Sequence, residues 1–464
     1  MGLNSEKKES RDDRKKKGNS GLHKIVFALC LYDAKIVGGI SGIFFVPDYW
    51  YICTMNNVLL ILLCLFISAP MQGSAATPHS KKMSRFVETE LSFAAKQSMS
   101  MYESVKDQKG RLPNRTDRND EFKTCPSNDW VSGFYPGLLW YIYEDTGDAE
   151  VRSAAEDLTR RLEKEQYNTK THDLGFMIGC SFGNGYRLTG REDYRQVLLN
   201  AAGSLASRFN PAVGCTRSWN KSHGWDFIVI IDNMMNLELL TMASGLGGNP
   251  NWYEMAKTHA NTTIKNHFRE DNSSYHVVDY DEATGKVRGK ATRQGYADES
   301  AWARGQAWGL YGFTMMYRQT GDPAYLEQAV KIADFISSPR NLPKDKIAYW
   351  DYNAPVTRDT PRDASAAAID ASALIELSRY TAGAKSKKYL RLAEQILFSL
   401  SSQKYRAQNV GDNHNFILKH STIFWSEGNF DTAVTYADYY YVEALMRYKR
   451  LLQGRPVVDV CTAK

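Results

Sequence analysis

A short helix-breaking motif recurs along this chain and divides most of it into pairs of helices. Thr-Gly-Asp stands at 146–148, Thr-Gly-Arg at 189–191 and Thr-Gly-Asp-Pro at 320–323, with looser copies at 247–250 and 382–383. Glycine readily takes the left-handed conformation that ends a helix, and Asp followed by Pro suits the start of the next one. The motif therefore predicts a helix–turn–helix hairpin repeated along the chain.

Apolar side chains repeat at helical spacing beside these junctions. In two stretches they are spaced by three or four residues and fall on one helix face. These side chains are Tyr194, Val197, Leu198, Ala201 and Leu205, and then Tyr325, Ala329, Ile332, Phe335 and Ile336. Alternating strand patterns are scarce, and one short strand is expected at 276–280.

We therefore expect an all-α fold in which six hairpins close into an α/α toroid, or barrel. Twelve helices would give about 32 residues for each helix with its loop, an ordinary length. A closed ring fits better than an open solenoid, because the repeats diverge and no polar capping repeat is evident. The predicted barrel is a single catalytic domain at 77–464, and the loops at one of its ends would build a cleft.

The first 76 residues have a different character. Residues 1–24 are polar and densely charged, which is typical of disorder, and 1–54 is predicted to be disordered or an over-extended reading frame ahead of Met55. An apolar run at 58–67 and small residues at 74–76 predict a secretory signal peptide at 55–76. The alternative is a true membrane anchor. A cleaved signal predicts export, to a periplasm in a Gram-negative source, and no stable membrane association afterwards.

Charge and aromatic content narrow the function. Lys and Arg number 58 against 52 Asp and Glu, and part of this small excess lies in the first 76 residues. The net charge of the chain after residue 76 is so small that no nucleic-acid partner is expected. The chain holds 10 Trp and 27 Tyr. Sugar-binding clefts have such compositions, because aromatic rings stack on the apolar faces of pyranose rings, but so do aromatic cores.

The cysteines do not form a metal-binding pattern. Cys125, Cys180, Cys215 and Cys461 show no Cys-x-x-Cys spacing, and the chain contains no His-Glu-x-x-His. We therefore expect neither a metal site nor a disulfide framework.

Four segments are too polar and aromatic for packing alone, at 129–137, 172–176, 230–237 and 294–308. In the third, Asp232 stands between Ile231 and a pair of methionines. It is either a helix N-cap or a carboxyl group held in an apolar wall, where desolvation would raise its pKa to suit a general acid. Asp173, which follows His172, carries the same two alternatives.

The fourth segment places two indole rings and a guanidinium within two helical turns. Trp302 and Arg304 cannot share a helix face, so they serve different walls or one of them lies at the helix start. For each of Trp302 and Trp308 the alternative is ordinary core packing.

Taken together in order, these segments resemble the unsaturated glucuronyl hydrolases. Tyr-Trp-Asp at 349–351 and Pro-Arg-Asp-Ala-Ser-Ala-Ala-Ala at 361–368 agree as well, and the resemblance runs from about residue 85 to 452. It implies the six-hairpin α/α toroid and no metal or organic cofactor. It also implies that Asp232 is the general acid/base and that Asp173 assists it.

The resemblance further implies a set of sugar-contacting residues. These are Trp130, His172, Trp219, His276, Gln294, Trp302, Arg304 and Trp308. Trp219 and His276 rest on their spacing to neighbouring motifs more than on local identity. From the loop at 426–436, which in the family helps to set preference for sulfated sugars, no individual residue is carried over.

The activity implied is removal of a 4,5-unsaturated glucuronyl residue from the non-reducing end of oligosaccharides that lyases release from glycosaminoglycans. A sibling activity on unsaturated galacturonyl-rhamnose from pectin stays open as an alternative. A non-catalytic glycan-binding toroid is a second alternative, and the presence of both Asp173 and Asp232 argues against it. The sequence leaves the oligomeric state open.

Overall fold

The computed structural model describes residues 43–46, 49–52, 77–222, 224–338 and 340–459. The chain divides into two units, Met1–Ala75 and Ala76–Lys464. The described part of the first unit is an antiparallel pair of strands, β1 (Ile43–Val46) and β2 (Tyr49–Ile52). The predicted disorder of 1–24 and the predicted signal at 55–76 lie outside the described residues, as does Cys461.

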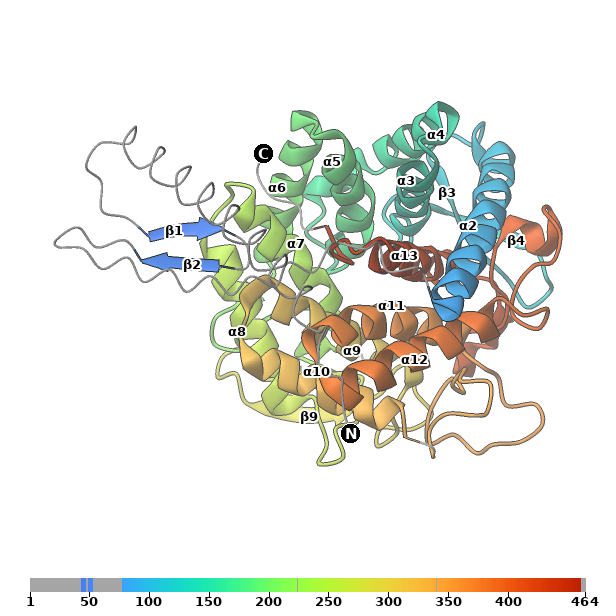
Figure 1. Ribbon diagram of the computed structural model, residues 1–464. Helices are drawn as coiled ribbons and strands as arrows, with labels where there is room; N and C mark the ends of the chain where they lie inside the picture. The colour runs from blue at the N-terminus through green and yellow to red at the C-terminus, as the bar shows by residue number, and fades with distance from the viewer. Residues whose placement is uncertain (1–42, 47–48, 53–76, 223, 339, 460–464) are drawn as a thin grey trace, which may run out of the picture. The chain divides into compact units, whose positions relative to one another are not determined.

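Six helical segments form an inner ring in the second unit (Figure 1). They are α3 (Phe134–Thr146), η2 (Gly175–Gly183) continued by α5 (Asn184–Thr189), α7 (Asn233–Gly245), α9 (Ala303–Thr320), α11 (Ala364–Tyr380) and α13 (Thr435–Leu452). Each packs against the next in chain order, and α13 packs against α3, which closes the ring. These helices are buried nearly all round; in α11 every residue from Ala364 to Ser378 is buried.

A second set of helices surrounds the ring. They are α2 (Pro78–Val105), α4 (Ala149–Arg160), α6 (Glu192–Ala206), α8 (Asn251–Asn266), α10 (Pro323–Ile336) and α12 (Gly383–Leu400). Five of them pack against the inner segment that precedes them, and α2 packs against α13, so that the first and last helices of the barrel make the sixth hairpin. The predicted six-hairpin α/α barrel is confirmed.

The predicted junctions are the turns from inner to outer helices. Gly147, Gly190 and Gly321 end α3, α5 and α9 with φ of 68°, 66° and 70°, a conformation that costs a residue with a Cβ more. Asp322 caps α10 by accepting a hydrogen bond from the Ala324 backbone N–H at 2.9 Å. The predicted faces are also confirmed, since the five residues of α6 are buried, as are four of the five in α10, with Phe335 partly buried.

The turns from outer to inner helices are much longer, and they hold most of the strands. They contain β3 (Arg111–Thr116) with β4 (Phe122–Pro126), β5 (Phe209–Asn210) with β6 (Cys215–Thr216), the sheet of β7 (Phe227–Ile230), β8 (Val277–Tyr280) and β9 (Val287–Ala291), and β10 (Ser421–Phe424) with β11 (Asn429–Thr432). Short helices η1 (Glu163–Tyr167), η3 (Asp412–Asn415) and η4 (Trp425–Glu427) lie there too. The strand predicted at 276–280 is β8. Because these loops all join outer to inner helices, they gather at one end of the barrel, called here the loop end.

Across the described ranges, no helix combines the length and the apolar character needed to cross a membrane. Cys125, Cys180 and Cys215 are free thiols.

Candidate active site

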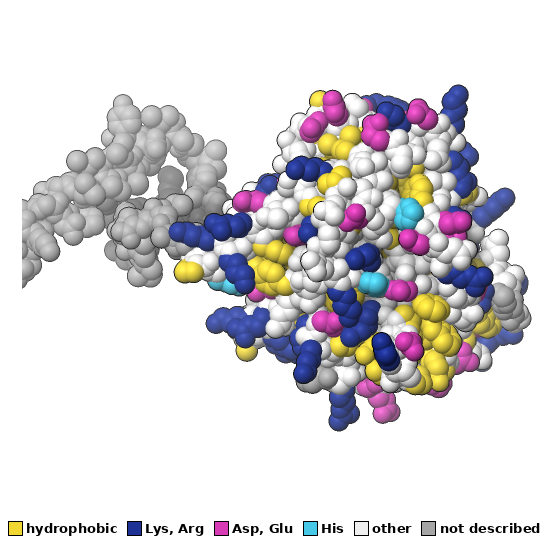
Figure 2. All heavy atoms as spheres, turned by 90° about the vertical axis from the view of Figure 1, so that its right-hand side faces the viewer, with side chains coloured by type: hydrophobic (Ala, Val, Ile, Leu, Met, Phe, Trp, Pro, Cys, Tyr) yellow, Lys and Arg dark blue, Asp and Glu magenta, His cyan; other side chains and the backbone are white. Residues whose placement is uncertain are grey.

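The residues predicted for the site come together at the loop end. Each lies in an outer-to-inner loop or in the first two turns of an inner helix. Figure 2 views the molecule from the right-hand side of Figure 1, and on that face hydrophobic patches lie between charged side chains of both signs. The barrel therefore brings together four segments that are distant in sequence.

Asp232 lies at the N-cap position of α7, but its side chain makes no capping hydrogen bond there. The carboxyl group is buried, and within the described part of the chain its Oδ2 has no hydrogen-bond partner. Burial raises its pKa to about 7; the Arg304 guanidinium opposes this shift, and the charge of Asp173 adds to it. Of the two alternatives, the structure thus favours the buried carboxyl group over the helix cap.

Asp173 lies just before η2 and also has a raised pKa. Burial raises the pKa to about 6, while a hydrogen bond from Thr171 and the charge of Arg208 oppose the shift. The Thr171 hydroxyl donates to Oδ2 at 2.6 Å, and Nε2 of His172 lies 3.3 Å from Oδ1. Burial lowers the pKa of His172 to about 3, so this imidazole is neutral. Asp173 is a second acid, electrostatically coupled to Asp232.

His276 is a neutral imidazole in a fixed tautomer. Its Nδ1 accepts hydrogen bonds from the backbone N–H groups of Arg293 and Gln294, at 3.1 and 3.2 Å. The ring proton must then be on Nε2, which lies 3.9 Å from Oδ2 of Asp232. Burial lowers the pKa of His276 to about 3. The ring therefore presents an N–H, and no positive charge, toward the buried acid.

Aromatic rings lie around His276 and Asp232. Trp130 and Trp219 are half-buried, and Trp219 packs its edge on His276 at 6.2 Å between ring centroids. Trp308 is fully buried, and its side-chain hydrogen bond to the Asp232 carboxyl opposes the rise in the pKa of Asp232. Trp302 is the N-cap residue of α9 and packs on His276 at 4.6 Å. The helix-start arrangement expected for Trp302 or Arg304 is thus the one observed.

Arg304 is fully buried and bound by protein groups. Its guanidinium pairs with Asp363 at 3.0 Å and donates to the backbone oxygens of Thr422 and Ile423. The Gln294 side chain donates to the same Ile423 oxygen at 2.9 Å. Both residues thus hold the 421–432 hairpin against the site, and their contact with a sugar stays a prediction.

Sequence reasoning missed three residues that complete the site. Asp363 caps α11 by accepting from the Ser365 N–H and also pairs with Arg304. Its Asp-Ala-Ser context signals a helix cap, and nothing in the sequence shows the pairing. Phe176 and Tyr436 pack on Trp130 at 5.7 and 5.0 Å. Phe176 belongs to one of the four polar and aromatic segments, whereas Tyr436 has no signal beyond being aromatic.

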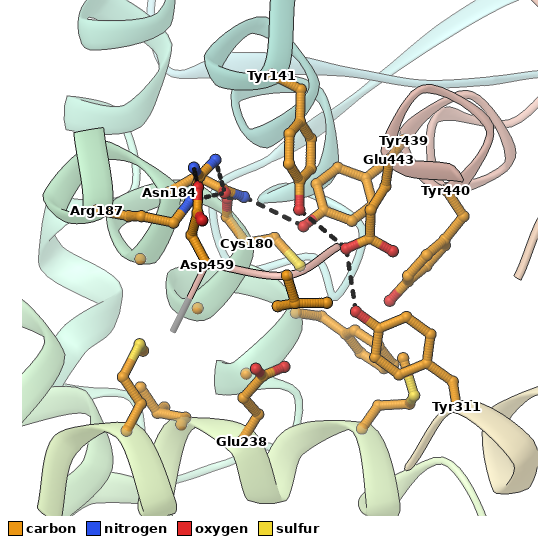
Figure 3. A pocket seen from close by; sticks show the side chains of 18 of the residues that line it. Tyr141, Cys180, Asn184, Arg187, Glu238, Tyr311, Tyr439, Tyr440, Glu443 and Asp459 are labelled. Atoms are coloured by element: carbon orange, nitrogen blue, oxygen red, sulfur yellow. Dashed lines mark hydrogen bonds and ion pairs between the residues drawn. The ribbon is translucent and has the colours of Figure 1, made fainter. Parts of the chain in front are cut away.

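A separate cavity of about 90 Å³ lies at the other ends of the inner helices (Figure 3). Its wall is a network in which Tyr141 and Tyr311 donate to Glu443 at 2.9 and 3.0 Å, and Arg447 donates to the Tyr311 oxygen at 2.7 Å. None of the predicted site residues lines it. Phe176 contributes to its wall and also packs on Trp308 at 5.1 Å, so a layer of aromatic rings separates the cavity from Asp232.

Buried polar atoms near Asp232 lack hydrogen-bond partners in the described part of the chain, among them Nδ1 of His172 and Nε2 of His276. Most buried polar groups in folded proteins have a hydrogen-bond partner, so these atoms are available to a ligand or to water. No group of three or more His, Cys, Asp or Glu side chains in the described residues is arranged to hold a metal ion. The arrangement of these side chains supports proton transfer by the Asp232 carboxyl group.

An α/α barrel that holds a buried acid with a near-neutral pKa among aromatic rings suits acid/base chemistry on a sugar. The chain belongs to Glycosyl Hydrolase Family 88, whose family model matches residues 104–451, and it is a glycoside hydrolase. A relative named unsaturated glucuronyl hydrolase, from Formosa agariphila, is 46% identical over 330 residues, covering 70% of this chain and 82% of the relative.

Solved structures agree with this assignment. The structure of an unsaturated glucuronyl hydrolase specific for heparin matches with a TM-score of 0.76 and 44% identity, covering 82% of this chain and 100% of that chain. The unsaturated glucuronyl hydrolase from Bacillus sp. GL1, described as responsible for the degradation of glycosaminoglycan, matches with a TM-score of 0.74 and 28% identity, over 79% of this chain and 97% of that one.

Proposed function

We propose that this protein removes a 4,5-unsaturated glucuronyl residue from the non-reducing end of oligosaccharides that lyases release from glycosaminoglycans. The observation that carries this is Asp232, a buried carboxyl group with a pKa raised to about 7 and an unpaired Oδ2 among the described residues. At neutral pH such a group holds its proton in a large fraction of molecules, as a general acid must. The relatives' names supply the substrate class.

In the reaction proposed, the substrate is a vinyl ether with its double bond between C4 and C5. Protonated Asp232 gives its proton to C4, and positive charge develops on C5 and the ring oxygen. Water then adds to C5 while the Asp232 carboxylate accepts one of its protons, so the carboxyl group is regenerated. The hemiketal formed at C5 opens, and the hemiacetal left at C1 collapses to an aldehyde and releases the remaining sugar with a free hydroxyl group.

The neighbours of Asp232 suit this cycle. His276 keeps an N–H directed at the carboxyl without supplying charge, because two backbone N–H groups occupy its Nδ1. Asp173 adds negative charge, which raises the pKa of Asp232 and stabilises positive charge developing on the sugar. One carboxyl serves both steps, unlike the paired carboxylates of displacement mechanisms.

The test is a comparison of substrates. Unsaturated disaccharides from chondroitin, hyaluronan, heparin and rhamnogalacturonan are offered side by side to the purified protein, and loss of the conjugated double-bond absorbance is followed. Turnover of one or more glycosaminoglycan disaccharides with little on the rhamnogalacturonan product supports the proposal. Preference for the latter would favour the pectin alternative, and binding without turnover would favour a non-catalytic toroid.

We further propose that the protein is exported, to the periplasm in a Gram-negative source, through cleavage of a signal within 55–76. The apolar run at 58–67 followed by small residues supports this. The N-terminal sequence of the protein recovered from a periplasmic fraction tests it. A mature chain that begins near residue 77 agrees, and retention of the full chain in the membrane fraction would show an anchor instead.

A further inference from the structure

Two large aromatic side chains are exposed beside the site. Trp425 in η4 is 42% exposed and Tyr296 is 46% exposed. Trp425 lies flat on Trp350, with ring centroids 5.1 Å apart and planes 10° apart, and Tyr296 meets the edge of Trp350 at 6.4 Å. Trp350 itself is buried. We call Trp350, Trp425 and Tyr296 the outer platform.

The backbone of the outer platform is held firmly. Trp350 accepts a hydrogen bond from the Ala303 N–H at 3.0 Å and donates its own N–H to the Pro361 oxygen at 3.2 Å. The Tyr296 N–H donates to the Asp351 carboxylate at 2.9 Å. The exposed rings are therefore pre-arranged and lose little conformational freedom on binding. Exposing such rings to water is unfavourable, and grouped exposed apolar surface marks interaction sites.

The outer platform is continuous with the candidate active site. Gln294 gives its backbone N–H to His276 and its side chain to the Ile423 oxygen. Tyr296 follows Gln294 by two residues, and Trp425 follows Ile423 by two. Trp302, which packs on His276, pairs as an isolated β-bridge with Asp351, next to Trp350. Three loops thus lead directly from the acid to the exposed rings.

The outer platform has a polar border. Arg293 lies over the Phe424 ring at 4.8 Å and pairs with Glu427 at 3.4 Å, joining the 293–300 loop to η4. Flat aromatic faces with charged and hydrogen-bonding groups at their edge suit a pyranose ring, which presents C–H groups on its face and hydroxyl groups at its rim. The occupant is therefore sugar rather than a protein segment.

We infer that the outer platform binds the substrate chain beyond the sugar that leaves directly, at the third ring counted from the unsaturated end. This inference rests on the proposed function and deepens it, because it makes the protein selective for unsaturated tetrasaccharides over disaccharides. With the outer platform at the third ring, a disaccharide would end before it reaches Trp425 and would gain nothing from these rings.

The test compares kcat/KM on an unsaturated disaccharide and on the tetrasaccharide of the same repeat. Trp425→Ala is expected to lower the tetrasaccharide-to-disaccharide ratio about 5- to 10-fold, the size of one aromatic stacking contact. Tyr296→Ala lowers the ratio less, and Trp425→Phe restores most of it. Tyr253→Ala, a half-buried ring of α8 at the opposite end of the barrel, is the control and leaves the ratio unchanged.

Two outcomes overturn the inference. Equal losses on both substrates would show that Trp425 supports the loop or the reacting sugar, and an unchanged ratio would show that the rings bind no sugar. Calorimetric binding of the tetrasaccharide to Asp232→Asn, with and without Trp425→Ala, measures the contact without any need for turnover. If wild type cleaves neither substrate, the proposed function fails, whereas loss of tetrasaccharide binding in the double variant alone still supports the outer platform.

Discussion

At the scale of single residues, Asp232 decides the chemistry. Asp232→Asn keeps the size of the side chain but can neither donate a proton to C4 nor accept one from water. General acid/base catalysis contributes about 10²–10⁴-fold, so kcat on an unsaturated disaccharide is expected to fall at least a hundredfold. Substrate binding survives if the aromatic rings carry the affinity. Near-normal turnover would move the proton donor to Asp173.

The same substitution has a consequence for stability that depends on pH. The pKa of Asp232 is about 7 in the folded protein against an ordinary value of 3.8, so the folded state binds the proton more tightly. Its stabilising contribution is therefore complete below about pH 4 and is lost as the pH rises through 7. Asp232→Asn removes this pH-dependent loss of stability, because an amide does not titrate in this range.

The difference in unfolding free energy between variant and wild type should therefore grow in favour of the variant from pH 4 to pH 8, by as much as about 4 kcal/mol. Thermal or urea unfolding at several pH values measures it. A difference that stays constant across this range would mean that the carboxyl is not desolvated.

Arg304 illustrates how burial changes an expectation drawn from sequence. A guanidinium near a sugar cleft suits an acidic sugar, but here it is fully buried against Asp363. Arg304→Ala leaves Asp363 charged and unpaired, which costs about 3–5 kcal/mol. A marked fall in Tm is expected together with a lower kcat/KM.

The double variant Arg304→Ala/Asp363→Ala should lose less stability than the two single variants added together, because it leaves no orphaned charge. Strict additivity of the two losses, or an unchanged Tm in Arg304→Ala, would show that the pair contributes nothing to folding.

At the scale of elements, the position of α7 depends on a close approach to α9. A Cβ on Gly312 would lie 2.5 Å from the Met234 Cβ and 3.1 Å from its backbone carbon, atoms that cannot move away without shifting α7. Gly312→Ala should therefore destabilise the protein by about 1–3 kcal/mol and lower kcat, because Asp232 stands at the start of α7.

Gly309, one turn earlier in α9, supplies the matched control. A Cβ there would be 3.4 Å from a flexible methyl group of Ile332. Since Ala is favoured over Gly in helices by about 1 kcal/mol, Gly309→Ala should be neutral or stabilising. Unfolding curves and kcat are measured for the two variants. Equal effects would show that the contact of a Cβ at 312 with Met234 does not position α7.

The helices were predictable because their signals are local. Gly147, Gly190 and Gly321 end helices through their own backbone freedom, and Asp322 caps from the adjacent position. Asp232 was ambiguous because a cap and a buried acid have the same sequence context and differ in where the carboxyl points. The contact of Arg304 with Ile423 joins residues 119 positions apart. The stacking of Trp350 on Trp425 likewise leaves no repeating pattern in the sequence. These two contacts join segments that only the closed barrel brings together, so local sequence could not predict them.

At the scale of the whole molecule, α2 supplies the outer helix of the sixth hairpin, whereas the contact of α13 with α3 closes the inner ring. α2 buries Met83, Val87, Leu91 and Met101 and packs against α13, where the Tyr441 hydroxyl donates to Glu90 at 2.9 Å. The first of the two units ends at Ala75, and every predicted site residue lies after that point. A protein that lacks 1–76 should therefore fold and be active.

A protein that lacks 1–105 tests the other half of this argument. Without α2 the sixth hairpin is missing, and the apolar face of α13 is exposed beside the start of the ring. Loss of cooperative unfolding and a tendency to aggregate are expected, whereas the 77–464 protein should unfold in one transition and keep the kcat/KM of the full chain. Calorimetry and the absorbance assay on both proteins measure this. A folded, active 106–464 protein would show that five hairpins suffice, and an inactive 77–464 protein would show that the N-terminal unit contributes to the barrel.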